Sequence, residues 1–420
     1  MISAFANAFK IPDLRKKILF TFGIIALYRF GAHVPVPGIS QKLIDMIAAN
    51  VSSSGALGLL NLFAGGALER FAIFSLGIMP YITSSIIMQL LQAVIPKLEE
   101  WSKEGETGQR KITQITRYMT LGLGLVESLG LLAMFQSKNY GVNQQFPLLM
   151  QILIVITLIA GTAFIMWMCE LITQRGIGNG MSLIIFSSIV ARFPTTIYSA
   201  TATAGWYWVV IILVIVVFVV AAIVTMERAQ RRIPVQYAKR IVGRKVYGGA
   251  GTYIPLKLNG ANVVPIIFAS SVLYLPTVLV GFFPNKAMQA VSAALSSGPL
   301  NWGIEAVLIV FFAYFYTALI FNPIDLADNM RKQGGFIPGV RPGKATATYI
   351  ENVLNRITLP GAIFLAAVAV VPAILFQTTK VQLLQQFGGT SILIMVGVAL
   401  ETMTQLESQL RMRHYDGFFK

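Results

Sequence analysis

Long apolar stretches dominate the pattern of hydrophobic and polar positions along this chain. The clearest of them, residues 206–226, contains no charged side chain. An α-helix needs about 20 apolar residues to cross the hydrocarbon core of a bilayer. Ten stretches have this length or nearly so, and each predicts a membrane-spanning helix. They cover residues 18–36, 71–94, 112–135, 148–170, 181–198, 206–226, 262–282, 303–322, 354–376 and 386–404.

Residues 181–198 are the weakest of these ten stretches. Pro194 lies close to their end, and a proline inside a helix removes one backbone donor and crowds the preceding turn. The sequence therefore predicts that this helix ends early, near Pro194.

One apolar run, residues 57–68, is too short to cross a membrane. It contains Gly65 and Gly66, and the charged residues Glu69 and Arg70 interrupt the pattern immediately afterwards. Since a spanning helix needs about 20 residues, the run must have another place in the fold. The hydrophobic pattern alone does not say which.

Composition agrees with a membrane protein. The chain has 420 residues, of which 55% are hydrophobic and 12% charged, whereas soluble proteins are typically about 25% charged. Lipid is therefore the expected solvent for most of the surface. The net charge of +16 is compatible with nucleic acid, acidic lipid or an acidic protein as a partner.

The positions of the basic residues favour membrane anchoring as the simplest reason for this charge. With ten spans, both termini lie on the same side, and most of the 33 Lys and Arg residues fall in the segments on that side. By the positive-inside rule, both termini are expected in the cytoplasm of a cell whose cytoplasmic membrane the chain crosses. The predicted outer segments contain only Lys42, Lys138, Arg192, Lys286 and Lys380.

The spans divide evenly around residues 199–205. We therefore predict an N-terminal half, residues 1–203, and a C-terminal half, residues 204–420, each with five spans. An odd number of spans gives the two halves opposite orientations, an arrangement found in many membrane pathways. The C-terminal half also contains two basic cytoplasmic loops, residues 227–261 and 323–356.

The sequence offers little for catalysis or metal binding. Cys169 is the only cysteine, so no intrachain disulfide can form, and there are only two histidines. Residues 339–346 resemble a phosphate-binding loop but have the wrong glycine spacing, and the glycines of residues 175–180 do not fit a dinucleotide-binding motif. We therefore expect no catalytic residue, metal or cofactor, and no enzyme activity.

An ion-coupled secondary transporter or a lipid flippase is the main alternative function. Such proteins use ionisable groups within their spans, and Arg29 and Glu127 lie inside apolar stretches. Arg29 has a simpler interpretation, in which it reaches a membrane interface or pairs with an acid on a neighbouring helix. A transporter should lose its function when Glu127 is neutralised, whereas a channel should tolerate that change.

Several spans combine isolated isoleucines with small polar residues. Ile82 and Ile86 are four residues apart and share one helical face, as do Ile185 and Ile189. An apolar constriction in a partly wet passage can stop ions by dewetting. Ordinary helix packing also enriches Ser, Thr and Gly, so the pattern leaves both interpretations open.

Five long motifs then make a specific resemblance visible, and they occur in the same order as in the family that they resemble. Together they show that the chain, over essentially its whole length, resembles the SecY/Sec61-alpha family of protein-translocation channels. The motifs are GIMPYITSSIIMQLL at 77–91, EGETGQRKITQITRY at 104–118, ITQRGIGNGMSLIIF at 172–186, QRRIPVQYAKR at 230–240 and IPGVRPGKAT at 337–346.

The resemblance implies an all-α membrane protein with ten transmembrane helices in two pseudo-symmetric five-helix halves, hinged like a clamshell. It also gives the short apolar run a place, as a re-entrant plug helix within residues 57–70. Such a helix is tolerated at membrane depth because protein buries it. The plug residues implied are Leu57, Leu60, Phe63, Gly65 and Gly66.

The resemblance further implies three sets of functional residues. A ring of six aliphatic side chains narrows the pore, and it matches Ile82, Ile86, Ile185, Ile189, Ile267 and Ile394. A lateral gate of spans two, three, seven and eight would contain Thr83, Gln89, Gln92, Ser270 and Ser271. The two basic loops would dock partners through Arg231, Arg232, Lys239, Arg240 and Arg341.

The implied function is that of the central channel of the Sec translocase. Unfolded preproteins would cross the cytoplasmic membrane, and transmembrane segments would leave sideways into lipid. The implied partners are the small membrane subunits SecE and SecG, the motor ATPase SecA, the ribosome, preproteins with their signal sequences, and anionic membrane lipids. A partner would supply the energy.

Overall fold

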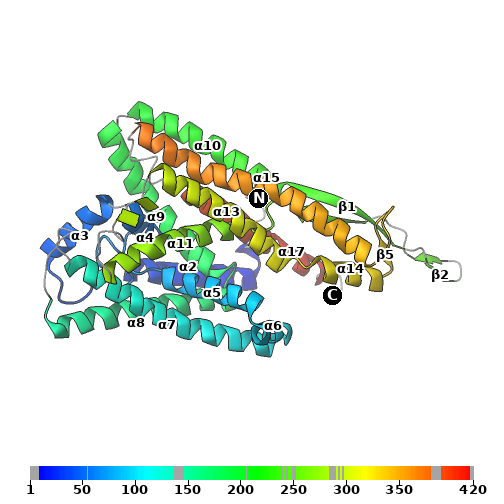
Figure 1. The fold of residues 1–420 in the computed structure, drawn as a ribbon, viewed down its shortest axis with the longest axis horizontal. Coiled ribbons are helices and arrows are strands. Elements are labelled where there is room, and N and C mark those ends of the chain that lie inside the picture. Colours follow the sequence, from blue (N-terminus) through cyan, green and yellow to red (C-terminus); the bar gives the residue numbers. More distant parts are fainter. Residues whose placement is uncertain are drawn as a thin grey trace.

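The computed structural model describes residues 9–53, 55–136, 146–204, 206–237, 240–242, 245–247, 252–282, 290–291, 294–295, 298–379 and 389–416. Long helices packed side by side make up most of the molecule, and a small β region extends from one end (Figure 1). The resemblance predicted a helical membrane protein, and the structure confirms this class.

A helix lies over each of the ten predicted apolar stretches. By length and composition, seven helices in the described part of the chain could cross a membrane, or eight if the bent pair α5 and α6 (Pro96–Lys103) counts as one span. The ten helices are α2 (Pro12–Gly31), α5 (Met79–Val94), α7 (Glu106–Gln136), α8 (Leu148–Arg175), α9 (Gly180–Ala204), α10 (Trp206–Arg228), α11 (Val264–Phe282), α13 (Pro299–Ile320), α15 (Lys344–Thr379) and α17 (Gly389–Asp416).

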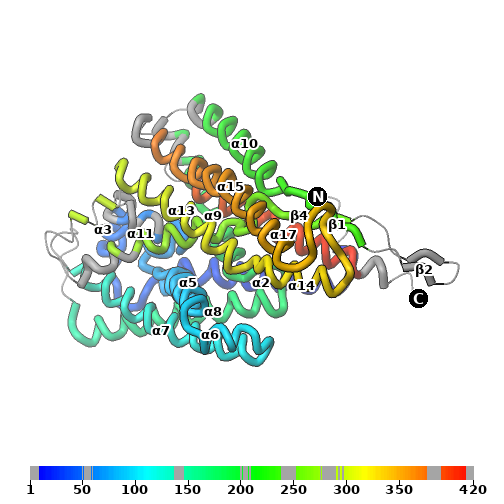
Figure 2. The backbone as a smooth tube through the Cα atoms, turned by 45° about the vertical axis from the view of Figure 1, so that its right-hand side comes forward, coloured from blue at the N-terminus to red at the C-terminus, as the bar shows by residue number. Residues whose placement is uncertain are grey.

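Helices from the N-terminal and C-terminal parts of the chain form opposite sides of the molecule. Helices α7 and α8 form one side, and α10, α13 and α15 form the other, with α9 and α17 between them (Figure 2). Helix α5 contacts α11 and α9 contacts α17, so helices from both parts meet at the centre. The hydrophobic core runs through this central region.

Two expected helix boundaries were wrong. Helix α9 continues through Pro194 to Ala204, because its packing against α8, α10 and α17 outweighs the local cost of one lost hydrogen bond. The second predicted span, residues 71–94, becomes helical only at Met79. Its first part is apolar because it is buried in protein, where the Phe71 carbonyl accepts a hydrogen bond from the Val36 amide at 2.9 Å.

Two short helices, α3 (Gln41–Ser53) and α4 (Gly55–Phe63), lie between α2 and the buried segment that precedes α5. In α3, Leu43, Ile47 and Val51 are buried and share one face, as expected for an amphipathic helix on a protein surface. Helix α4 has only 9 residues. It contacts α3, α9 and α11, and Leu60 and Phe63 near its end are buried.

A β region in the first basic loop was missed by the all-α prediction. Strand β1 (Gln230–Tyr237) pairs antiparallel with β4 (Thr252–Lys257) and with β5 (Gly335–Phe336). Strands β2 (Arg240–Val242) and β3 (Lys245–Tyr247) form a second antiparallel pair.

The sheet has a small core of its own. Ile233 and Val235 of β1 and Leu256 of β4 are buried together with Ile350 of α15 and Met330 of α14 (Pro323–Lys332). This packing fixes the β region and α14 at the same end of the molecule, beside the start of α15 (Figure 1).

Candidate functional site

Six isoleucines from four helices lie in one hydrophobic core cluster. None of their side chains is more than 5% exposed, so none of the six faces lipid. Ile392 is as deeply buried as Ile394, and burial therefore does not choose between these two positions of α17. The isoleucines are Ile82 and Ile86 on α5, Ile185 and Ile189 on α9, Ile267 on α11 and Ile394 on α17.

Helix α4 packs onto the same cluster. Leu60 and Phe63 are buried in it, and α4 contacts the two helices that carry Ile185, Ile189 and Ile267. The predicted plug residue Leu57 also belongs to α4, but its side chain lies outside the described part of the structure. A nine-residue helix cannot cross a bilayer, so this position inside protein accounts for the short apolar run.

Glycines let the chain turn sharply after α4. Gly65 and Gly66 have φ angles of 65° and 85°, a left-handed conformation that side chains with a Cβ rarely adopt. The amide of Gly66 donates to the Asn61 carbonyl at 2.9 Å, and the Glu69 amide donates to the Asn61 side-chain oxygen at 3.2 Å. Asn61 thus holds both sides of the turn.

Side chains from distant helices then fasten this turn. Arg192 of α9 forms an ion pair with Glu69 at 3.1 Å, and Arg29 of α2 donates to the Gly65 carbonyl at 3.2 Å. Among the described residues, Arg29 thus binds a backbone carbonyl of the segment 57–70, and no ion pair joins it to an acid on a neighbouring helix.

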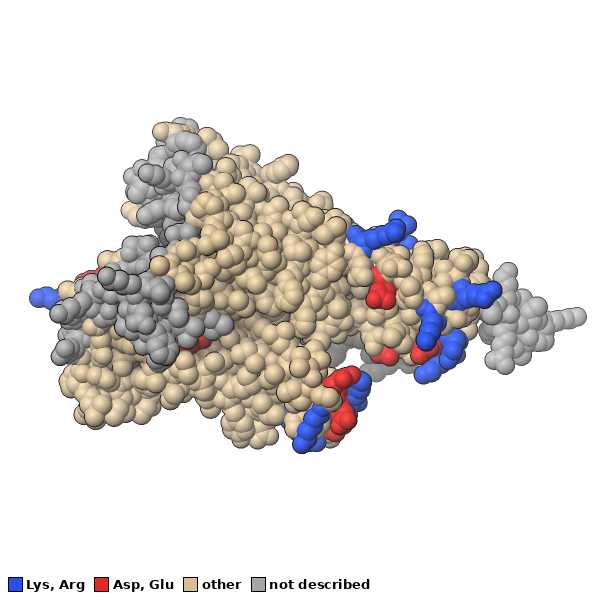
Figure 3. All heavy atoms as spheres, in the orientation of Figure 1, with Lys and Arg blue, Asp and Glu red and all other residues tan. Residues whose placement is uncertain are grey.

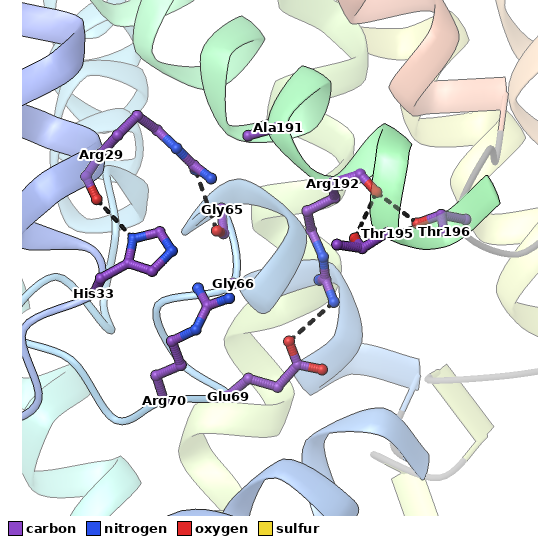
Figure 4. Close-up of a pocket in the computed structure, with 10 residues that line it drawn as sticks. All are labelled: Arg29, His33, Gly65, Gly66, Glu69, Arg70, Ala191, Arg192, Thr195 and Thr196. Carbon is purple, nitrogen blue, oxygen red and sulfur yellow. Dashed lines mark hydrogen bonds and ion pairs between the residues drawn. The ribbon is translucent and has the colours of Figure 1, made fainter. Parts of the chain in front are cut away.

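These groups surround a cavity of about 400 Å³ (Figure 4). Arg29, Arg70 and Arg192 line it together with Glu69 and His33. The ring nitrogen Nδ1 of His33 lies 2.8 Å from the Arg29 carbonyl. A carbonyl only accepts, so Nδ1 is the donor.

Three of the predicted gate residues are hydrogen-bonded within their own helices. The hydroxyl of Thr83 donates to the Met79 carbonyl at 3.0 Å. Ser270 and Ser271 each donate to the carbonyl four residues earlier at 2.8 Å. Each of these three hydroxyls therefore has its partner within its own helix.

Glutamines on α5 behave differently. Nε2 of Gln89 lies 3.4 Å from the Ser85 hydroxyl, but its Oε1 is buried without a hydrogen-bond partner among the described residues. Gln92 is partly buried, three residues further along the helix. Among the predicted gate residues, Gln89 thus has a buried side-chain oxygen that could gain a hydrogen bond if the helices of the predicted gate rearranged.

The contact between α7 and α11 contains two buried polar residues, Glu127 and Tyr274, that the gate prediction did not include. Helices α7 and α11 contact each other, and both carboxylate oxygens of Glu127 and the hydroxyl of Tyr274 are buried without a hydrogen-bond partner in the described part of the chain. In the sequence, Glu127 could be recognised only as an isolated acid in a span. That it lies on a helix packed against α11 could be seen only in the structure.

Basic residues gather at the end that carries the β region (Figure 3). Arg231 and Arg232 are exposed on β1, and the Arg232 guanidinium lies over the Tyr253 ring at 4.8 Å. Arg341 is exposed between Gly339 and Gly343, which both have positive φ angles. Lys239 and the side chain of Arg240 lie outside the described residues.

A family model described as SecY matches residues 72–403. The chain belongs to the SecY family. Curated relatives described as protein translocase subunit SecY match over the full length of both chains, at 48% identity for Streptomyces scabiei and 44% for Mycobacterium tuberculosis. The SecY family and the apolar helices together make this a multi-pass membrane protein.

Solved structures share the fold. One described as a protein-conducting channel has a TM-score of 0.60 at 17% identity and covers 93% of this chain and 91% of its own. Another, which reports that the plug domain of SecY stabilises the closed channel, has a TM-score of 0.64 at 18% identity with the same coverage. The yeast Ssh1 complex bound to the 80S ribosome gives 0.60 at 14%, covering 93% and 88%. The transporter and flippase alternative is not favoured by these relatives.

Proposed function

We propose that this SecY family chain is the central channel through which unfolded preproteins cross the cytoplasmic membrane. The observation that carries the proposal is the burial of Leu60 and Phe63 of α4 in the same cluster as the six isoleucines. A short helix on an apolar cluster can be replaced by a passing chain, because neither surface requires specific hydrogen bonds. Membrane-embedded apolar constrictions also exclude ions when they dewet.

In this mechanism, the isoleucines form the constriction and the segment 57–70 forms the plug. Displacement of α4 exposes the isoleucine side chains to the translocating polypeptide. Aliphatic side chains offer no donor or acceptor, so they do not select among sequences. The seam of α5 and α7 against α11 and α13 would separate to release apolar segments into lipid, because these segments gain free energy by leaving water.

The basic end is proposed as the docking surface, facing the cytoplasm with both termini. Exposed Arg231, Arg232 and Arg341 suit phosphate or carboxylate partners, since guanidinium groups bind both in a bidentate manner. We propose the ribosome and the motor ATPase SecA as partners, SecE and SecG as small subunits, and anionic lipids at the basic loops. Arg341→Glu should reduce motor-driven export while leaving the thermal stability unchanged, because the side chain is exposed.

Reconstituted translocation tests the proposal against the transporter alternative. The chain and its small subunits are placed in vesicles with the motor ATPase, ATP and a preprotein, and the protease-protected preprotein is measured. We expect protection in the parent and in Glu127→Gln. A parent that protects no preprotein, or a Glu127→Gln variant that folds but loses all protection, contradicts the channel function.

A further inference from the structure

The cavity beside the plug segment has more positive charge than its own residues can balance. Arg29, Arg70 and Arg192 line it, and Glu69 is the only acidic side chain among the residues that line it in the described structure. Glu69 pairs with Arg192. Arg70 is exposed and has no hydrogen bond or ion pair with any described residue. Two positive charges are left over.

The glycine turn forms one wall of this cavity. A Cβ atom added at Gly65 would lie 2.5 Å from Nη1 of Arg29, and one added at Gly66 would lie 3.4 Å from Nη1 of Arg70. Two guanidinium groups therefore lie directly on adjacent residues of the backbone, and both point toward the cavity (Figure 4). Like charges held this close repel each other, and an anion between them relieves that repulsion.

We propose that this cavity is a binding site for a phosphate-type oxyanion. Arginine forks bind phosphate and carboxylate oxygens with short, charge-assisted hydrogen bonds. Glu69 occupies Arg192 through the contact between Oε2 and Nη2. The remaining guanidinium groups come from different elements, and a tetrahedral phosphate has enough oxygens to accept from both.

The arginines of the site come from three parts of the fold. Arg29 belongs to α2, Arg192 to α9, and Arg70 to the turn that follows the plug helix. A bound phosphate would therefore connect the turn to the surrounding helices. If the segment acts as the proposed plug, occupancy of the site favours the closed channel, but the binding itself does not depend on that function.

The first experiment uses the purified full chain with its small subunits in detergent. Binding of inorganic phosphate is measured by calorimetry against chloride at equal ionic strength. The test variant is Arg70→Gln, which should fold normally because the side chain is exposed. The matched control is Lys42→Gln, which removes one exposed charge from α3 without lining the cavity.

We expect the parent and Lys42→Gln to bind phosphate at one site with the same Kd. Loss of one charge-assisted contact should weaken binding by Arg70→Gln about tenfold or more. Equal phosphate affinity in Arg70→Gln and the parent would overturn the proposal.

The second experiment separates a lipid headgroup from free phosphate as the source. Native mass spectrometry of the same samples reports any phospholipid that stays bound. A lipid retained by the parent and Lys42→Gln but lost by Arg70→Gln identifies a headgroup as the ligand. If the parent neither binds phosphate nor retains such a lipid, the site does not exist. Both measurements are made without translocation, so this failure would leave the channel function untouched.

Discussion

The segment 57–70, which we propose as the plug, is held in two different ways along its length. Leu60 and Phe63 of α4 are held by burial in the main hydrophobic core, which also contains the six isoleucines, whereas the turn after α4 is held by directed contacts from Arg29 and Arg192. Burial is proportional to area and has no preferred direction. The charged contacts require particular partners at particular positions. Under the proposed function, we expect the apolar contacts to form a seal that a passing chain can replace, and the polar turn to determine where the plug returns.

Ile86→Asn should have the largest effect, because it places a polar side chain in the proposed apolar constriction. Asn buries an amide in an apolar cluster at a cost of about 1–3 kcal/mol, in addition to the lost packing of the isoleucine. We expect ion conductance of reconstituted channels to rise about tenfold or more, and preproteins with weaker signal sequences to be exported. Ile86→Val is the matched control. Unchanged conductance in a folded Ile86→Asn variant would show that Ile86 is not part of the seal.

Glu69→Gln should have a smaller effect, because it breaks the ion pair with Arg192 without touching the apolar cluster. The two side chains are 28% and 19% exposed, so solvent weakens the pair and we expect a loss of about 1 kcal/mol. The fraction of plugs accessible to a thiol reagent, measured with a cysteine placed in the turn, should rise about fivefold.

Exchange of the two charges provides the control for this pair. Glu69→Arg combined with Arg192→Glu should recover part of the loss, because the double variant can form the pair in reverse. If the single variants leave plug accessibility unchanged, the ion pair has no part in holding the turn.

Gly65→Ala tests the backbone of the same turn. Its φ angle of 65° disfavours any residue with a Cβ, and that Cβ would also overlap the Arg29 guanidinium. We expect the free energy of unfolding to fall by about 1 kcal/mol, measured as a lower midpoint of thermal unfolding. Gly23→Ala is the control, since a Cβ there meets nothing within 4 Å. Equal midpoints in the two variants would contradict the assigned strain.

Thr83→Val should have the smallest effect, because the Thr83 hydroxyl is bonded within α5 and does not join the two sides of the seam. We expect a change of less than about 1 kcal/mol in the free energy of unfolding and unchanged selection of signal sequences. Gln89→Leu removes an unpartnered buried oxygen and should stabilise the closed seam. A large gating defect in Thr83→Val would show that its hydroxyl bonds across the open seam.

Hydropathy predicted where the helices lie because about 20 apolar residues in succession have few alternatives to a span. It failed at residues 71–78, since hydropathy does not distinguish burial in protein from burial in lipid. The helix-breaking tendency of proline failed at Pro194, where packing outweighs the local break. Strand β1 was predictable in principle from the alternation of Ile233, Val235 and Tyr237 with polar residues.

The contacts of the plug turn could not have been predicted from the sequence. Glu69 and Arg192 are 123 positions apart, and nothing local distinguishes Arg192 from the other basic residues of the outer segments. The resemblance supplied the six isoleucines, and the structure places them in one buried cluster. Their action as a ring remains a proposal.

Photocrosslinking of an arrested preprotein tests the isoleucine constriction most directly. A photoreactive residue is placed in turn at Ile86, at Ile189 and at Phe218, a control position on α10 that is 75% exposed. We expect crosslinks from both isoleucine positions to the translocating segment and none from Phe218. Crosslinks from Phe218 alone, in variants that still export, would show that the chain passes elsewhere.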